Sequence, residues 1–163
     1  MLDIPYPGGP LLDKLAEEGD AHRYRFPHAH TPGKYDFSFS GLKTAVINQA
    51  HTIRQQGGQI DAAGFAASFR RAVVDALVEK SVAAAVEAGA TALAAAGGVA
   101  ANRLLRRELE RRGAQAGLRV FLPPVALCTD NAAMIGSAAF YRLMRGETAA
   151  LDLNALPSLR MFA

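Results

Sequence analysis

The chain has 163 residues, of which 50% are hydrophobic and 20% are charged, and a formal net charge of +3. This balance is typical of one soluble globular domain and excludes a disordered chain. No apolar run reaches the roughly 18–20 residues of a membrane helix, and the opening residues lack the basic and apolar regions of a secretory signal. The single cysteine, Cys128, excludes an internal disulfide and suits a reducing compartment. We therefore expect one cytoplasmic domain over residues 1–163, with no membrane partner.

The mild positive charge permits a nucleic-acid partner without arguing for one. Much of it lies in five arginines between residues 103 and 112. Two interpretations stay open for this segment. It forms a solvated helix face partly balanced by Glu108 and Glu110, or it contacts a phosphate backbone.

The pattern over the first third of the chain predicts a turn, two helices, a loop and one strand. Residues 6–10, YPGGP, predict a turn that leads into a short helix ending at Gly19. Residues 20–35 have little periodicity and predict a loop. Aromatic and polar residues alternate over 35–39, which indicates a half-buried strand. A helix over 42–54 follows.

The longest predicted helix covers residues 61–87. Asp61 is a suitable N-cap, and Gly89 supplies the C-terminal stop. Apolar residues recur on one stripe of this segment, so the helix should cross the core.

The second half alternates between strand and helix. Residues 91–96 and 118–122 predict strands, and helices are expected over 101–112 and 131–145. This order implies parallel strands with helices packed on the sheet. Ligands of such sheets bind at the carboxyl ends of the strands.

Two segments lie at those strand ends. Gly97-Gly98 follows the first strand, where glycines let a ligand approach the main chain and helix N–H groups attract anions. Glycine is also used in such turns for purely steric reasons. Asp130 follows the second strand, either as an N-cap of the last helix or as a metal ligand. His28 and His30 form no helical pair that would complete a metal site with it.

Four strings together resemble the TsaD family, earlier labelled O-sialoglycoprotein endopeptidase or glycoprotease. They are YPGGP at 6–10, DFSFSGLKT at 36–44, AGGVAAN at 96–102 and CTDNAAMI at 128–135. The closing DLNA at 152–155 also matches. The strings stand in the family's order and spacing, and the resemblance covers residues 5–156.

The resemblance implies the C-terminal lobe of a two-lobed actin-like ATPase (RNase H-like) fold, an α/β lobe with a mixed sheet and flanking helices. It also implies an acyltransferase of tRNA modification. The family transfers threonylcarbamoyl from threonylcarbamoyl-adenylate to the adenosine 3′ of the tRNA anticodon. In the complete system TsaB-like and TsaE-like partner proteins accompany the enzyme.

The resemblance further implies the residues of a site. Gly9 and Asp13 match nucleotide-contacting positions, Asp13 through ribose hydroxyls, and Asn102 matches another beside the Gly97-Gly98 turn. Asp130 matches the one ligand that this lobe gives to a divalent metal, iron or zinc. No residue is assigned a catalytic role.

The family's metal-binding histidine pair lies in an N-terminal lobe that this sequence does not contain. We therefore expect a fragment that is inactive alone. Two alternatives remain: a glycoprotease-type metallopeptidase, and a non-catalytic scaffold partner of the same fold. The protease would need a metal-bound water and a general base, of which the chain offers one candidate ligand. The scaffold would be expected to lack the nucleotide and metal residues, which are present here.

Overall fold

The computed structural model describes residues 2, 4–27, 31, 33–156 and 158. The chain separates into two compact units, Met1–Cys128 and Thr129–Ala163, which we describe one at a time. The expectation of one domain over the whole chain stays a prediction. Among the described residues, no helix is long and apolar enough to cross a membrane.

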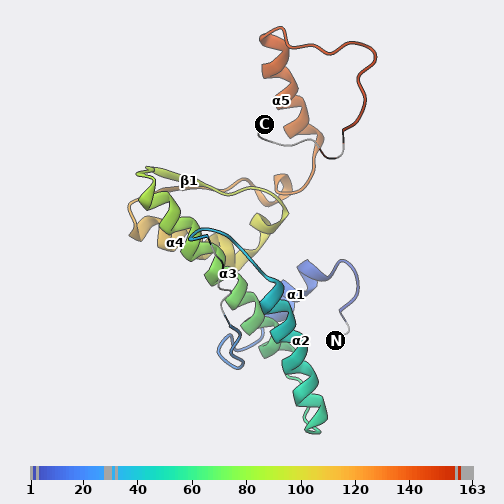
Figure 1. Cartoon of the computed structure of the whole chain (residues 1–163), viewed down its shortest axis with the longest axis vertical. Coiled ribbons are helices and arrows are strands. Elements are labelled where there is room, and N and C mark those ends of the chain that lie inside the picture. The colour runs from blue at the N-terminus through green and yellow to red at the C-terminus, as the bar shows by residue number, and fades with distance from the viewer. Residues whose placement is uncertain (1, 3, 28–30, 32, 157, 159–163) are drawn as a thin grey trace. The chain divides into compact units, whose positions relative to one another are not determined.

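The first unit is an α/β assembly whose elements appear in Figure 1. In chain order they are α1 (Gly8–Ala16), α2 (Ser40–Gln55), α3 (Ala62–Glu87), β1 (Ala92–Ala94), the short helical turn η1 (Gly98–Ala101), α4 (Arg103–Gln115), β2 (Arg119–Phe121) and the turn η2 (Val125–Leu127). The second unit holds α5 (Ala132–Met144). The predicted helices after residue 40 and both predicted strands after residue 90 are confirmed, with ends that differ by a few residues.

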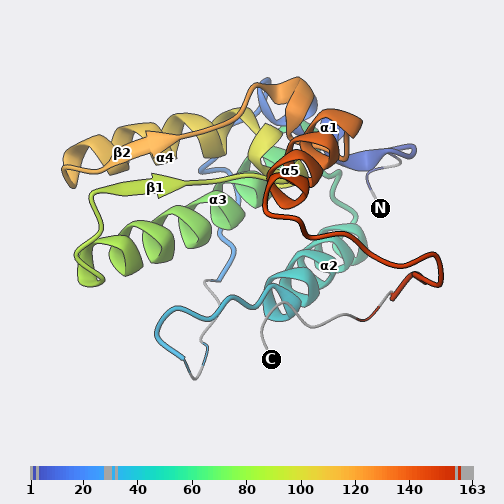
Figure 2. The same ribbon diagram turned by 90° about the horizontal axis from the view of Figure 1, so that it is seen from above.

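The strands β1 and β2 pair in parallel, as the strand–helix order predicts. Leu93 lies opposite Val120 in the register. The helix α4 connects the two strands, and Figure 2 shows α3 and α4 running beside the pair. The resemblance implied a mixed sheet, whereas the sheet in the described part of the chain is this parallel pair.

The helix α3 contributes to all three hydrophobic clusters that the described residues of the first unit form. Val74 and Val78 pack with leucines of α4 beneath the sheet. Phe65 packs with three residues of α2, and Ala66 and Ala67 pack with Ala16 of α1. The prediction that the long helix crosses the core is therefore confirmed.

The predicted ends of α3 are also confirmed. Asp61 is the N-cap, and its Oδ1 accepts a hydrogen bond of 3.0 Å from the Gly64 N–H. Gly89 follows the helix at φ 64°, a conformation that glycine adopts without a steric penalty. Local chemistry thus sets both limits of the longest helix.

Removing the Asp61 cap should destabilise the chain measurably. Asp61→Ala leaves the Gly64 N–H without its acceptor, and we expect the free energy of unfolding to fall by about 1 kcal/mol. Asp61→Asn keeps an oxygen in place and should lose only a few tenths of that amount. Urea unfolding followed by circular dichroism checks both variants. Equal losses in the two would mean that the hydrogen bond is not the source of the effect.

The predicted strand over 35–39 is wrong, because this segment is irregular and helix α2 begins at Ser40. A strand needs a neighbour to receive its main-chain hydrogen bonds, and β1 and β2 pair only with each other among the described residues. The aromatic residues instead stack, with the rings of Phe37 and Phe39 6.4 Å apart and nearly parallel. The Lys80 ammonium lies 5.8 Å from the Phe37 ring.

Two smaller predictions are also corrected. The segment 6–10 is not wholly a turn, since α1 begins at Gly8. Asp130 is not the N-cap of the last helix. Asn131 holds that position, and its Oδ1 accepts a hydrogen bond of 2.9 Å from the Met134 N–H. Asparagine and aspartate cap helices about equally well, so the sequence alone did not separate the two neighbours.

The arginine-rich segment is not simply a solvated face. Arg106 donates to the main-chain oxygens of Ala100 and Pro123, both at 2.9 Å. Arg112 pairs with Asp75 of α3 at 2.6 Å. Some of these arginines therefore link α4 to α3 and to the neighbouring loops through hydrogen bonds and an ion pair. A phosphate contact by the exposed arginines of the segment stays a prediction.

Candidate nucleotide-binding site

The structure brings together two of the predicted site residues that are far apart in the sequence. The Asn102 side chain donates from Nδ2 to Asp13 Oδ1 over 2.7 Å. Asp13 lies in α1, and Asn102 immediately precedes α4. The contact places the N-terminal helix beside the loop that follows β1, which is where the strand-end rule puts a ligand.

Both the oxygen and the nitrogen of the Asn102 side-chain amide form hydrogen bonds. Its Oδ1 accepts from the Leu105 N–H at 2.9 Å and caps α4. Its Nδ2 is then the end that reaches Asp13. Because the cap needs the oxygen and the carboxylate needs the nitrogen, this network fixes the orientation of the amide. The side chain is thus positioned before any ligand arrives.

The turn before Asn102 uses glycine where the backbone requires it. Gly97 has φ 88°, a conformation that other residues adopt only under strain. The Ala100 N–H donates to the Gly97 carbonyl oxygen at 3.0 Å and closes the turn. The steric reason for glycine therefore applies to Gly97, whereas Gly98 has no such requirement.

Open space surrounds the main chain at three of the predicted glycines. A Cβ built on Gly9, Gly97 or Gly98 would meet no other described atom within 4 Å. A ligand can therefore approach the main chain at these positions. This open space is compatible with a bound nucleotide.

A buried arginine that the sequence reading missed completes the cluster. Arg70 of α3 donates from Nη1 to Asp13 Oδ1 at 2.9 Å and to the Asp13 carbonyl oxygen at 3.0 Å. Its Nη2 donates to the Ala16 carbonyl oxygen at 3.1 Å, and Glu17 forms a second ion pair with Nη1. The side chain is 8% exposed.

A signal for Arg70 was present in the sequence. It falls on the stripe of α3 that contains Ala66, Ala67, Val74 and Val78, at helical spacing from each. All four of these neighbours are buried. A charged residue within an apolar stripe must find a partner, since burying an unpaired charge is very costly.

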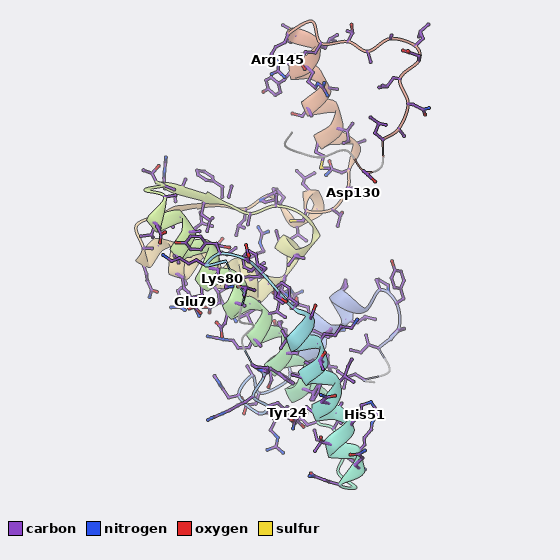
Figure 3. The ribbon with its side chains drawn as sticks, viewed as in Figure 1. Tyr24, His51, Glu79, Lys80, Asp130 and Arg145 are labelled. Carbon is purple, nitrogen blue, oxygen red and sulfur yellow. The ribbon has the colours of Figure 1, made fainter. Side chains whose placement is uncertain are left out.

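Asp130 lies in the second unit, on the segment that leads into α5, where Figure 3 labels it. Its side chain is exposed. In the described residues, no group of three or more His, Cys, Asp or Glu side chains is placed to hold a metal ion. His28 and His30 lie outside the described residues. The structure does not relate Asp130 to the cluster of Asp13 and Asn102, so a shared site stays a prediction.

Comparison with known protein families shows to which family this chain belongs. The family model described as TsaD, tRNA N6-adenosine threonylcarbamoyltransferase, matches residues 1–137. This chain belongs to the TsaD family. Its helices around a small parallel sheet are consistent with the actin-like ATPase fold of TsaD proteins.

Curated relatives carry the same name along nearly the whole chain. A tRNA N6-adenosine threonylcarbamoyltransferase of Moorella thermoacetica is 54% identical over 160 residues. Those of Caldicellulosiruptor saccharolyticus and Clostridium botulinum are 46% and 44% identical. Each alignment covers 98% of this chain and 47% of the relative. The chain thus spans about half the length of the TsaD proteins that it matches.

Proposed function

We propose that this chain forms the C-terminal lobe of a tRNA N6-adenosine threonylcarbamoyltransferase and supplies one wall of its adenylate site. The observation that carries the proposal is the contact between Asp13 and Asn102 beside the open Gly97-Gly98 turn. The family match and the shared name of the three relatives support transfer to tRNA and disfavour peptide hydrolysis.

The proposed reaction moves an acyl group between two nucleotides. The exocyclic amine of a tRNA adenosine attacks the carbonyl carbon of threonylcarbamoyl-adenylate and forms a C–N bond. The bond from that carbon to the phosphate oxygen breaks, AMP leaves, and the amine loses a proton. Such a reaction needs the adenylate held with its carbonyl group exposed to the amine.

This chain's residues are suited to hold the adenylate. The Asp13 carboxylate accepts hydrogen bonds from ribose hydroxyls. Main-chain N–H groups at Gly97 and Gly98 lie at the start of a helical turn, where an anionic group is favoured. Gly9 lies in the first turn of α1, and the space around its main chain is open. The chain thereby binds and orients the nucleotide, and we assign it no proton-transfer residue.

The described residues do not by themselves form the metal site that the family resemblance implies. An iron or zinc site takes three or four protein ligands. Asp130 supplies one carboxylate, and no second and third donor stand beside it in the described part of the chain. We therefore propose Asp130 as a single metal ligand that requires others from the remainder of the enzyme.

The proposed partners follow from the reaction. The substrate is tRNA, which the exposed arginines of α4 are suited to approach through its phosphates. The adenylate must come from a separate activation step. We propose that TsaB-like and TsaE-like proteins accompany the complete enzyme.

A substitution at Gly98 tests whether a nucleotide binds beside the Gly97-Gly98 turn, and it should not disturb the fold. Since a Cβ at Gly98 meets open space, Gly98→Val should leave the thermal midpoint unchanged. The added methyls should block ligand approach, and AMP affinity should fall by at least about tenfold from a starting Kd on the order of millimolar. NMR titration of the 163-residue chain with AMP measures both affinities.

Gly98→Ala is the matched control for size. Its single methyl should weaken AMP binding less than valine does. Equal AMP affinity in the original chain and in Gly98→Val, with resonances of other residues responding to AMP, would place the nucleotide elsewhere.

A further inference from the structure

Arg70 is an unusual residue for its place in the core. It is 8% exposed and lies among the alanines and valines of α3. Burying a guanidinium costs free energy that its ion pairs offset only in part. Its buried Nε has no hydrogen-bond partner among the described residues, which adds to that cost. An apolar side chain of similar length would fill the same volume without this penalty.

Two of the four hydrogen bonds that Arg70 donates go to Asp13, and the other two go to the Glu17 carboxylate and the Ala16 carbonyl oxygen. Nη1 reaches both the carboxylate and the carbonyl oxygen of Asp13, at 2.9 and 3.0 Å. Holding the side chain and the main chain of one residue fixes the position of that residue more firmly than a single contact does. The contact from Nη2 to Ala16 anchors the last turn of α1 at the same time.

The two oxygens of the Asp13 carboxylate differ in the hydrogen bonds that they accept. Oδ1 accepts from Arg70 and from Asn102. Among the described residues, none donates a hydrogen bond to Oδ2. A carboxylate oxygen has lone pairs for two donors, so Oδ2 is free to accept from a ligand. The positive charge of Arg70 is shared between the carboxylates of Asp13 and Glu17.

We propose that Arg70 is a positioning residue of the nucleotide site: it holds the Asp13 carboxylate through Oδ1 so that Oδ2 accepts from the ribose hydroxyls. This inference rests on the proposed function, which assigns the ribose contact to Asp13. Arg70 itself touches no ligand. Its effect on binding should therefore appear only for ligands that carry the hydroxyls.

The test compares two probes on the full 163-residue chain, AMP and an analogue that lacks both ribose hydroxyls, dideoxy-AMP. We expect the original chain to bind AMP about 3- to 10-fold more tightly, the range that one or two hydrogen bonds supply. Arg70→Met should abolish this preference and leave the affinity for dideoxy-AMP unchanged. NMR titrations give the four dissociation constants.

Two further variants separate an effect on the nucleotide site from a loss of folding. Arg71→Met is the matched control, because Arg71 is the next residue of α3 and pairs with Asp75 at 2.6 Å instead of with the site. It should keep the full preference for AMP. Arg70→Lys keeps the charge but not the planar guanidinium, so it should retain part of the preference even if Arg70→Met unfolds.

Three results would overturn the inference in distinguishable ways. If the original chain itself binds both probes equally, the ribose contact of the proposed function is wrong and the role of Arg70 falls with it. If the original chain prefers AMP and both Arg70 variants keep that preference in full, only the role of Arg70 is wrong. A loss of affinity for both probes alike would assign Arg70 a purely structural role.

Discussion

The purified 163-residue chain is expected to leave tRNA unmodified when it is supplied with threonylcarbamoyl-adenylate. The chain covers 47% of its Moorella relative, and we assign the remaining metal ligands and adenylate contacts to the part that it does not cover. Losing one donor to a transition state costs about 10²–10³ in rate, and several are lost here. We therefore expect a rate at least about a thousandfold below that of the relative.

Mass spectrometry of the nucleosides from digested tRNA measures this rate. The Moorella thermoacetica enzyme, assayed under the same conditions, is the positive control. Turnover of the chain alone within a factor of about ten of that control, equivalent to only 1.4 kcal/mol, would show that the described lobe holds a complete site.

Truncating Phe65 is expected to cause the largest loss of stability among single core substitutions. Phe65 is 1% exposed, and the rings of Tyr24 and Phe26 meet it edge-on at 5.0 and 5.3 Å. Phe65→Ala removes these contacts and leaves a cavity between α2 and α3. We expect the free energy of unfolding to fall by about 3–5 kcal/mol.

Phe37→Ala is the control, since Phe37 is 47% exposed and mainly loses its stacking on Phe39. It should cost at most about 1.5 kcal/mol. Urea unfolding at one temperature compares the two variants. If Phe37→Ala proved the more damaging, the packing of α2 on α3 through Phe65 would not be what stabilises the first unit.

Local signals predicted the helices and the parallel pair well. Asp61 and Gly89 mark the ends of α3 because capping and positive φ act within a few residues. Parallel pairing followed from the strand–helix–strand order, which needs no knowledge of distant contacts. The same reasoning failed over 35–39, where alternation gave no information about whether a partner strand exists.

In the candidate site, too, local features could be predicted and distant contacts could not. The resemblance supplied Asp13 and Asn102, and the structure places them in contact across 89 positions of sequence. The place of Arg70 in the apolar stripe of α3 indicates a buried partner, but that partner, Asp13, lies 57 positions away and cannot be named from the local pattern. Asp130 is a different case. The sequence placed it between the second strand and the last helix, but no group of three or more possible metal ligands exists among the described residues, so its role as a metal ligand stays a prediction.

A chimera tests the central claim most directly. It joins the part of the Moorella thermoacetica enzyme that this chain does not cover to the chain itself, replacing the segment that is 54% identical. We predict that the chimera converts adenosine 3′ of the anticodon to its threonylcarbamoyl form in a tRNA assay with threonylcarbamoyl-adenylate. Asp13→Ala in the chimera should weaken adenylate binding by about 5- to 100-fold, as the loss of a carboxylate contact does. A chimera that folds, with a thermal midpoint close to that of the Moorella enzyme, yet modifies no tRNA would contradict the assignment of this chain as one wall of the transferase site.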